Sequence, residues 1–421
     1  MGRPGGVVPG RGPAGGGPRA HASGQVVAVF SGGGTGGHLY PALALADALS
    51  RVRPDVRPFF VGAERGLEAQ VLPERGLDHL LLPVRGFERG AMRGSTGVLK
   101  GILATMTRFL AVLDGMARSL LATGEAFTRL RPGLVVVTGG YAGGPAGLMA
   151  GLMGVPLALQ EQNAYPGVTT RALSRWSRQV HLAFPEARDA LPRRTRSRIR
   201  ISGNPIRVPT PGDTAADRAH FGLAEVSRVV LVVGGSQGAV AVNRAVLEVV
   251  RGVEEGSFRR PEDLQILWAT GPGNQEAVEE ELRNAGSPEW VRALGYIHEM
   301  PRALRVADVA VSRAGAMATS EFLAWGVPAI LVPLPTAAAD HQARNAESLA
   351  RAGAAVHLPE AKLSGEVLWK AITTLLEAPQ ELETMRRAGL ERGRPEATRQ
   401  IAEALADLLP LPVRTPGGGA S

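Results

Sequence analysis

Two stretches of this sequence decide its fold: VVAVFSGGGTGGH at residues 26–38 and VVLVVGGSQGA at residues 229–239. Each begins with an apolar run that predicts a strand, passes through a glycine-rich turn and leads into a helical pattern. This order opens doubly wound folds, which bind ligands at the carboxyl ends of their parallel strands. Because the pattern starts twice, we expect two such units in one chain.

The sequence around each start alternates predicted strands with predicted helices. The predicted strands cover residues 26–31, 56–62, 134–138, 156–160, 229–233, 265–269, 309–312 and 329–332. The run from Val135 to Val137 is apolar at every position, which is typical of a strand covered by helices on both faces. The predicted class is therefore α/β, with two doubly wound Rossmann-like domains that face each other across a cleft.

Changes in composition predict the domain boundaries. Residues 1–24 are rich in Gly, Pro, Arg and Ala and are expected to form a disordered tail without a signal peptide. Residues 203–212 contain three Pro and two Gly and predict a hinge between a first domain, 25–204, and a second, 205–395. A C-terminal helix and loose tail are expected over 396–421.

Composition excludes several classes of protein. Among 421 residues there is no Cys, which excludes a disulfide framework or a zinc-thiolate site and fits a cytosolic protein. The formal net charge of +8 suits anionic ligands or a lipid surface, but it is too small and too scattered to indicate nucleic-acid binding.

Three glycine-rich turns are candidate phosphate sites: Gly32–His38, Gly139–Pro145 and Gly234–Ala239, the last with the hydroxyl of Ser236. Backbone N–H groups at such a turn, next to a helix start, face and stabilise an anion. Tight packing of helix on strand is the alternative explanation for the glycines. The first two turns are expected side by side, where a diphosphate is easily accommodated.

The first turn also satisfies the GxGxxG pattern of dinucleotide-binding proteins. That pattern needs an acidic residue at the end of the second strand, near Gly62, to hold a ribose. Asp55 precedes this point and Glu64 lies beyond it. The context therefore argues against a nicotinamide cofactor.

Three polar clusters follow predicted strands or begin helices. Gln160–Asn163 either binds a sugar at the cleft mouth or satisfies buried backbone groups. Ser312–Ala316 leads into a helix whose Glu321 either holds the two hydroxyls of a ribose or is an ordinary exposed helical acid. Asp340–Asn345 either contacts a sugar or caps a helix.

Taken in order from about Val26 to Ala355, these motifs resemble one family. They are GGGTGGH with Pro41, GGYAGGP, EQN at 161–163, GNPIR at 203–207, GGSQGA, SRAGA with Glu321, and DHQ with Asn345. The set resembles glycosyltransferase family 28, and within it the bacterial UDP-N-acetylglucosamine:lipid I N-acetylglucosaminyltransferases, the MurG family. Each glycine turn alone is a weak signal, whereas the ordered set is specific.

The resemblance implies a GT-B fold and an inverting transfer of GlcNAc from UDP-GlcNAc to the 4-hydroxyl of MurNAc in undecaprenyl-diphospho-MurNAc-pentapeptide, lipid I, which gives lipid II for peptidoglycan. It implies acceptor binding by the first domain and donor binding by the second. It also implies a peripheral location on the cytoplasmic face of the bacterial plasma membrane, with possible partners among cell-wall synthesis or division proteins. No cofactor and no metal are expected, since no D-x-D pattern is present.

The same resemblance assigns residues to roles. His38 is the first choice for the catalytic base, because an imidazole suits proton removal near neutral pH, and Glu161 is the second. The donor UDP-GlcNAc is assigned to Thr35, Gly36, Gly37, Asn163, Arg207, Ser236, Ile297, Ala316, Met317, Ala318, Thr319, Ser320, Glu321 and Gln342. The acceptor diphosphate is assigned to Gly34, Gly139, Gly140 and Tyr141.

This chain departs from the family pattern at three of these places. Gln160 stands where the family usually has His, Thr170 where it has Asn, and Ala318 where it has Thr. The last change removes a phosphate-facing hydroxyl, and we expect the N–H groups of that helix start to compensate. Two other functions stay open: a UDP-GlcNAc 2-epimerase-like enzyme, which needs no lipid acceptor, and a nucleotide-sugar binding protein without turnover.

A long amphipathic helix is expected over Val98–Leu121. One face carries Val98, Leu99, Ile102, Leu103, Met106, Phe109, Leu110, Leu113, Met116 and Leu120. The preceding segment places Arg85, Arg89 and Arg93 around Phe87 and Met92. The apolar face either covers the first sheet or, at one end, contacts a membrane. Since basic residues near an anionic surface each contribute about 1 kcal/mol, we expect salt-sensitive peripheral binding through residues 85–121.

Overall fold

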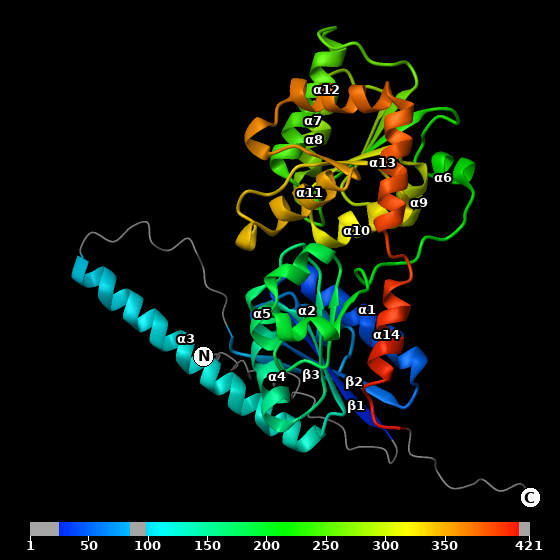
Figure 1. The fold of residues 1–421 in the computed structure, drawn as a ribbon. Helices are drawn as coiled ribbons and strands as arrows, with labels where there is room; N and C mark the ends of the chain where they lie inside the picture. Colours follow the sequence, from blue (N-terminus) through cyan, green and yellow to red (C-terminus); the bar gives the residue numbers. More distant parts are fainter. Residues whose placement is uncertain (1–24, 85–97, 412–421) are drawn as a thin grey trace, which may run out of the picture.

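The computed structural model describes residues 25–84 and 98–411. They form two lobes, one above the other in Figure 1, each built on a parallel sheet with helices on both faces. The prediction of an α/β protein with two doubly wound domains is confirmed.

The first lobe contains a parallel sheet in the order β3-β2-β1-β4-β5-β6-β7. Its strands are β1 Val26–Gly32, β2 Val56–Ala63, β3 His79–Leu82, β4 Leu134–Gly139, β5 Leu157–Glu161, β6 Gln179–Leu182 and β7 Ile199–Ile201. Its helices are α1 Gly36–Val52, α2 Glu68–Glu74, α3 Val98–Leu130, α4 Gly140–Met153 and α5 Val168–Leu173, followed by short 3-10 helices at Pro185–Ala190 and Arg193–Arg198.

The second lobe repeats this arrangement with the order β10-β9-β8-β11-β12-β13. Its strands are β8 Arg228–Val233, β9 Leu264–Ala269, β10 Val291–Leu294, β11 Val309–Ser312, β12 Ala329–Leu331 and β13 Ala355–His357. Its helices are α6 Thr214–His220, α7 Val240–Glu254, α8 Gln275–Asn284, α9 Met300–Val306, α10 Ala316–Trp325, α11 His341–Arg351, α12 Gly365–Leu376 and α13 Pro379–Arg392. In each lobe the first strand lies between the second and the fourth, so the order reverses beside it, where such folds bind ligands.

The all-apolar strands are explained by the two cores that each sheet separates. Val135 and Val137 of β4 pack into one core together with Phe127 of α3, whereas Val136 packs into the opposite core with Leu45 of α1. Successive side chains of a strand point to opposite faces, so a strand covered on both faces must be apolar throughout.

The last helix, α14 (Ala397–Ala406), returns to the first lobe, where it packs against α1 (Figure 1). Gln179 of β6 donates from Nε2 to the carbonyl oxygen of Ala404 at 2.8 Å, and Thr398 donates to the carbonyl oxygen of Ile206 at 2.8 Å. The two lobes are therefore connected by two crossings of the chain, one after β7 and one before α14.

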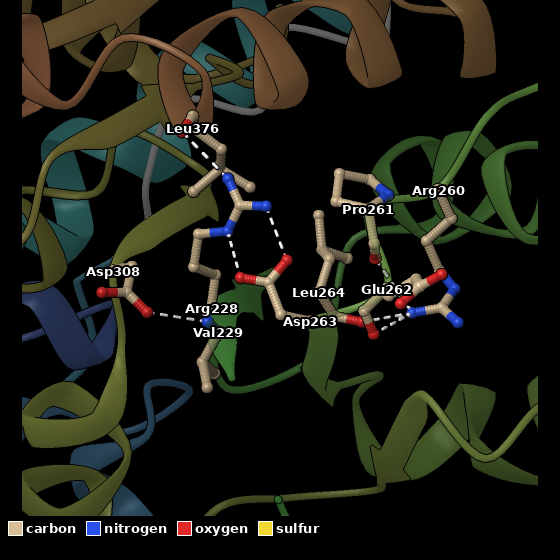
Figure 2. Close-up of polar contacts among 9 residues, drawn as sticks. All are labelled: Arg228, Val229, Arg260, Pro261, Glu262, Asp263, Leu264, Asp308 and Leu376. Carbon is tan, nitrogen blue, oxygen red and sulfur yellow. Dashed lines mark hydrogen bonds and ion pairs between the residues drawn. The ribbon is translucent and has the colours of Figure 1, made fainter. Parts of the chain in front are cut away.

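The amino ends of the second sheet are held by charged hydrogen bonds, shown in Figure 2. Arg228 donates to both carboxylate oxygens of Asp263, at 2.7 and 2.6 Å, and to the carbonyl oxygen of Leu376 at 3.0 Å. Asp308 accepts from the N–H of Val229 at 2.8 Å. The hydrogen bond from Arg228 lowers the pKa of Asp263. This cluster fixes the amino ends of β8, β9 and β11, opposite the carboxyl ends at which such sheets bind ligands.

Helix α3 continues to Leu130, beyond the predicted end near Leu121, and its last part packs on the sheet. Ala126, Phe127 and Leu130 lie in the core, whereas Leu121 is 75% exposed. The earlier part of α3 extends away from the first lobe (Figure 1). The predicted basic segment with Arg85, Arg89 and Arg93 lies outside the described residues. Within the described ranges, no helix combines the length and the apolar character that crossing a membrane requires.

Candidate functional site

The carboxyl ends of both sheets meet where the lobes touch. Asn204, which follows β7, donates from Nδ2 to the carbonyl oxygen of Ala316 at 3.2 Å and to the hydroxyl of Ser320 at 2.9 Å, both on α10. Asn345 of α11 accepts from the N–H of Ala164 at 2.8 Å. The glycine turns that follow β1 and β4 lie at the carboxyl ends of the strands of the first sheet, the end at which this junction lies. The candidate site is therefore the cleft between the two lobes.

The first turn ends where α1 begins, at Gly36. Gly34 has φ of +90°, in the left-handed region that glycine adopts without strain. Thr35 is exposed and stands at the N-cap position of α1. The N–H groups of Gly36 and Gly37 lie in the first helical turn of α1, where backbone N–H groups have no acceptor within the helix. These three residues therefore form a helix start that can hold an anion.

The second turn is shorter than predicted. The sequence predicts a loop through Pro145, but α4 begins at Gly140, so only Gly139 and Gly140 form the turn. Both have positive φ, +110° and +76°. A Cβ on Gly140 would lie 2.0 Å from the carbonyl oxygen of Gly33, so the two turns are in direct contact. The expectation that they lie side by side is confirmed.

His38 is held by the end of β4. Its Nδ1 lies 2.9 Å from the carbonyl oxygen of Thr138 and 3.0 Å from Oε1 of Gln162. The hydroxyl of Thr138 donates to the carbonyl oxygen of His38 at 2.8 Å. A Cβ on Gly139 would lie 2.8 Å from the His38 ring, which explains the glycine at that position. Ring and backbone of His38 are thus both fixed by the neighbouring strand.

Glu161 is the last residue of β5 and is 3% exposed. Its Oε1 accepts from the N–H and the side-chain amide of Asn163, at 3.1 and 3.2 Å. Its Oε2 accepts from the N–H of Gly167 at 2.9 Å and the hydroxyl of Thr170 at 2.7 Å. Both oxygens therefore hold the segment 162–170 in place, and Thr170 supplies one of the donors.

A second buried carboxylate lies under the first glycine turn. Glu68 has no exposed surface, and its Oε1 accepts from the N–H groups of Gly34 and Ala63, each at 2.9 Å. A Cβ on Gly33 would lie 1.9 Å from the same oxygen. The N–H of Gly34, assigned by resemblance to the acceptor diphosphate, is bound to Glu68 in this structure. Glu68 could not be predicted from the sequence, because nothing in its spacing distinguishes it from a surface acid.

In the second lobe, the start of α10 lies at the cleft. Ala316, Met317 and Ala318 form its first turn, and Gly315 at the N-cap leaves their N–H groups without a side-chain cap. The hydroxyl of Thr319 donates to the carbonyl oxygen of Gly315 at 3.0 Å, inside the helix. The N–H groups, rather than this hydroxyl, are what the helix start offers an anion.

Glu321 lies farther along α10, beside the cleft. Burial raises its pKa to about 7, although the guanidinium of Arg207 opposes the shift. Arg207 itself is exposed, and its positive charge lies near the carboxyl group of Glu321. Perturbed titratable groups in a cleft are candidates for a functional site.

The remaining donor residues occupy different environments. Ser236 is exposed on its turn before α7, while Ile297 is 3% exposed with its side chain in the core. Gln342 accepts from the N–H of Leu334 at 2.9 Å. Asn163 accepts from Nδ2 of Asn345 at 3.2 Å, which brings it against the second lobe.

His341, within the predicted polar cluster Asp340–Asn345, has no individual role assigned from the sequence. It begins α11, its Nδ1 is buried, and among the described residues it has no hydrogen-bond partner. Burial lowers its pKa, while the charge of Glu161 opposes the shift and that of His38 adds to it. Across residues 25–84 and 98–411, no three His, Asp or Glu side chains gather as a possible metal site.

Comparison of the sequence with known proteins identifies the family and the relatives that this chain resembles. Residues 28–182 match the glycosyltransferase family 28 N-terminal domain, and residues 229–401 match the glycosyltransferase family 28 C-terminal domain. A protein of Moorella thermoacetica named UDP-N-acetylglucosamine--N-acetylmuramyl-(pentapeptide) pyrophosphoryl-undecaprenol N-acetylglucosamine transferase is 38% identical, covering 90% of this chain and 97% of its own. A Bacillus subtilis protein of the same name is 34% identical, covering 90% and 99%.

Among solved structures, Acinetobacter baumannii MurG is 27% identical with a TM-score of 0.71, covering 91% of this chain and 99% of its own. A UDP-N-acetylglucosamine 2-epimerase aligns with a TM-score of 0.57 at 16% identity over 90% and 95% of the two chains, a likeness of fold alone.

Proposed function

The chain belongs to glycosyltransferase family 28, and we propose on this basis that it transfers GlcNAc from UDP-GlcNAc to the MurNAc 4-hydroxyl of lipid I. It is an N-acetylglucosaminyltransferase of peptidoglycan synthesis. The observation that carries the proposal is the shared identity of 34% to 39% with relatives of this one name over 90% of the chain.

We assign the two substrates to the two domains. Residues 205–395 bind UDP-GlcNAc, with Glu321 accepting from the ribose, the backbone of Ile297 contacting uracil, and Gln342 with Asn163 binding the sugar. Residues 25–204 bind the acceptor, whose diphosphate lies at the turns that contain Gly34 and Gly139–Tyr141. The contact between these two turns supports one continuous site for both phosphates.

An inverting displacement has two chemical needs: a base for the attacking hydroxyl and stabilisation of the negative charge that develops on departing UDP. We assign the second to Ser236, to the start of α10 at Ala316–Ala318 and to Arg207. Backbone N–H groups at a helix start stabilise phosphate whatever the side chain, so Ala318 in place of Thr leaves this role intact.

We assign the base to His38. Within the described residues no hydrogen bond reaches its Nε2, whereas both oxygens of Glu161 are bound to four donors. Both oxygens of Glu161 are thus occupied by donors of its own segment. Glu161 instead holds the segment that carries Asn163.

The lipid tail of the acceptor requires the enzyme to reach a membrane. We propose peripheral association with the cytoplasmic face of the plasma membrane through residues 85–121. Support comes from helix α3, whose earlier part extends away from the first lobe (Figure 1). Contact with other cell-wall synthesis or division proteins, and with it a role in cell shape and division, belongs to the same proposal.

The decisive experiment follows UDP release from UDP-GlcNAc with and without a lipid I analogue. We expect release that depends on the acceptor. Formation of UDP-ManNAc without acceptor would favour an epimerase, and binding without turnover would favour a nucleotide-sugar binding protein. Either result would overturn the transferase proposal.

A further inference from the structure

The Nδ1 atom of His38 faces two oxygen atoms. One is the carbonyl oxygen of Thr138 and the other is Oε1 of Gln162. A carbonyl oxygen accepts hydrogen bonds and never donates them, so a favourable contact requires the proton on Nδ1. In a neutral imidazole with Nδ1 protonated, Nε2 carries the lone pair. The surroundings of His38 therefore select the tautomer that a general base needs.

The orientation of the Gln162 amide is fixed in turn. Its Nε2 donates to the carbonyl oxygen of Thr138 at 2.7 Å and to Oε1 of Gln160. A rotated amide would place Oε1 against these two acceptors and would turn its NH2 group toward His38. Gln162 is 2% exposed, so water cannot replace the hydrogen bonds that such a rotation would break.

Two further buried amides continue the chain of hydrogen bonds to the second lobe. Gln160, 1% exposed, donates from Nε2 to Oδ1 of Asn204 at 2.9 Å. Asn204, also 1% exposed, donates from Nδ2 to the carbonyl oxygens of Gln162 and Ala316, at 3.1 and 3.2 Å, and to the hydroxyl of Ser320. Backbone carbonyls thus fix the orientation at both ends, and every amide between them follows.

We propose that the amide chain Gln162–Gln160–Asn204 adds to the carbonyl oxygen of Thr138 in keeping the proton of His38 on Nδ1, and that it makes the strength of this preference depend on the contact between the first lobe and α10. Gln162, Gln160 and Asn204 are positioning residues. The consequence for catalysis rests on the proposed role of His38 as the base, while the tautomer itself does not. Contact with α10, which we assign to the donor, would then prepare His38 for the acceptor hydroxyl.

The test is nitrogen NMR of the full-length protein labelled with 15N-histidine, which distinguishes a protonated ring nitrogen from an unprotonated one. His38 is identified by the signals lost in His38→Ala. In the parent we expect His38 with Nδ1 protonated. In Gln162→Met and Gln160→Met, which remove the amides at similar side-chain length, the carbonyl oxygen of Thr138 remains. We therefore expect the form protonated on Nδ1 to stay in the majority and a minor form protonated on Nε2 to appear, with the larger change for Gln162→Met.

Gln179→Met is the matched control. Gln179 is a buried glutamine whose Oε1 lies 3.0 Å from Nε2 of His181, far from the cleft on the α14 side of β6. This variant should change the signals of His181 and leave those of His38 unchanged. Because His181 lies directly opposite Gln160 in the β5–β6 pair, the fold of the Gln160 variant is read from His79 of β3, whose Nδ1 lies 2.7 Å from the carbonyl oxygen of Leu77. An unchanged His79 signal shows that the Gln160 variant is folded.

Activity gives an independent readout. We expect kcat to fall on the order of tenfold in Gln162→Met and less in Gln160→Met, with the KM for UDP-GlcNAc within about twofold of the parent. A parent His38 protonated on Nε2, or His38 signals unchanged in both variants, would overturn the proposal. Tautomer changes without any loss of kcat would leave the amide chain standing and would instead reject His38 as the base.

Discussion

Nδ2 of Asn345 donates to Oδ1 of Asn163 across 182 positions of sequence, at 3.2 Å, and this contact joins α11 of the second lobe to the segment after β5. The same side chain accepts from the N–H of Ala164 and donates to the carbonyl oxygen of Ala314. A single buried amide thus connects the lobes at the proposed sugar site.

Replacing Asn345 should destabilise the protein. Asn345→Ala leaves the N–H of Ala164 without its acceptor in a buried position, which costs roughly 2 kcal/mol. Urea unfolding measures the loss, and Asn284→Ala, at an exposed site on α8, is the control expected to change little. Equal stability of the two variants would show that the junction does not depend on Asn345.

Glu161→Gln should affect the loop more than the chemistry. An amide cannot accept four hydrogen bonds, so we expect a loss of stability of about 1–3 kcal/mol and a higher KM for UDP-GlcNAc. Thr170→Val removes one of the same donors, and the two losses should be less than additive in the double variant. A large fall in kcat at unchanged stability would return Glu161 to the role of base.

Glu321 should make stability depend on pH. Its pKa is about 7 in the folded protein and 4.5 in the unfolded chain, so the folded state binds more protons between these values. The free energy of unfolding should therefore fall as pH rises from 4.5 to 7, by about 3 kcal/mol at most. Glu321→Gln should lack this fall, so it should exceed the parent in stability above pH 7. Parallel stability curves for parent and variant would contradict the expectation.

His38→Ala should abolish most turnover and leave donor affinity nearly unchanged, because a base acts in the transition state rather than in donor binding. Loss of a general base typically costs about 100- to 10,000-fold in rate. Steady-state kinetics and UDP-GlcNAc titration measure the two quantities. A variant that keeps most of its activity would transfer the base role to another group or to solvent.

Membrane binding should be electrostatic in part. Sedimentation with vesicles should show stronger binding to anionic than to neutral lipid, weakened by salt, because basic residues are attracted to the negative surface. Replacing Arg85, Arg89 and Arg93 with Ser should reduce binding to anionic vesicles. Arg283→Ser, the same kind of substitution on α8 of the second lobe, is the control. Equal binding to both vesicle types would reject the electrostatic contribution.

The sequence by itself determined the two sheets, the places of the glycine turns and the family. Those conclusions rest on local patterns: a run such as Val135–Val137 predicts a doubly covered strand because neighbouring residues alone reveal its two apolar faces. His38 and Glu321 were singled out as candidates for the same reason, since each stands at a fixed offset from a glycine turn.

The tertiary structure alone decided what the polar groups bind. Glu68 lies under the first glycine turn, Glu161 has no free oxygen, and Gln160 joins His38 to α10 through Asn204. It also decided that α14 returns to α1. The donors to Glu161 lie 2 to 9 positions away, while Gly34, Asn204 and Ser320 lie 34 to 116 positions from their partners. In both cases a hydrogen bond is determined by distance and direction in space, which local periodicity does not contain.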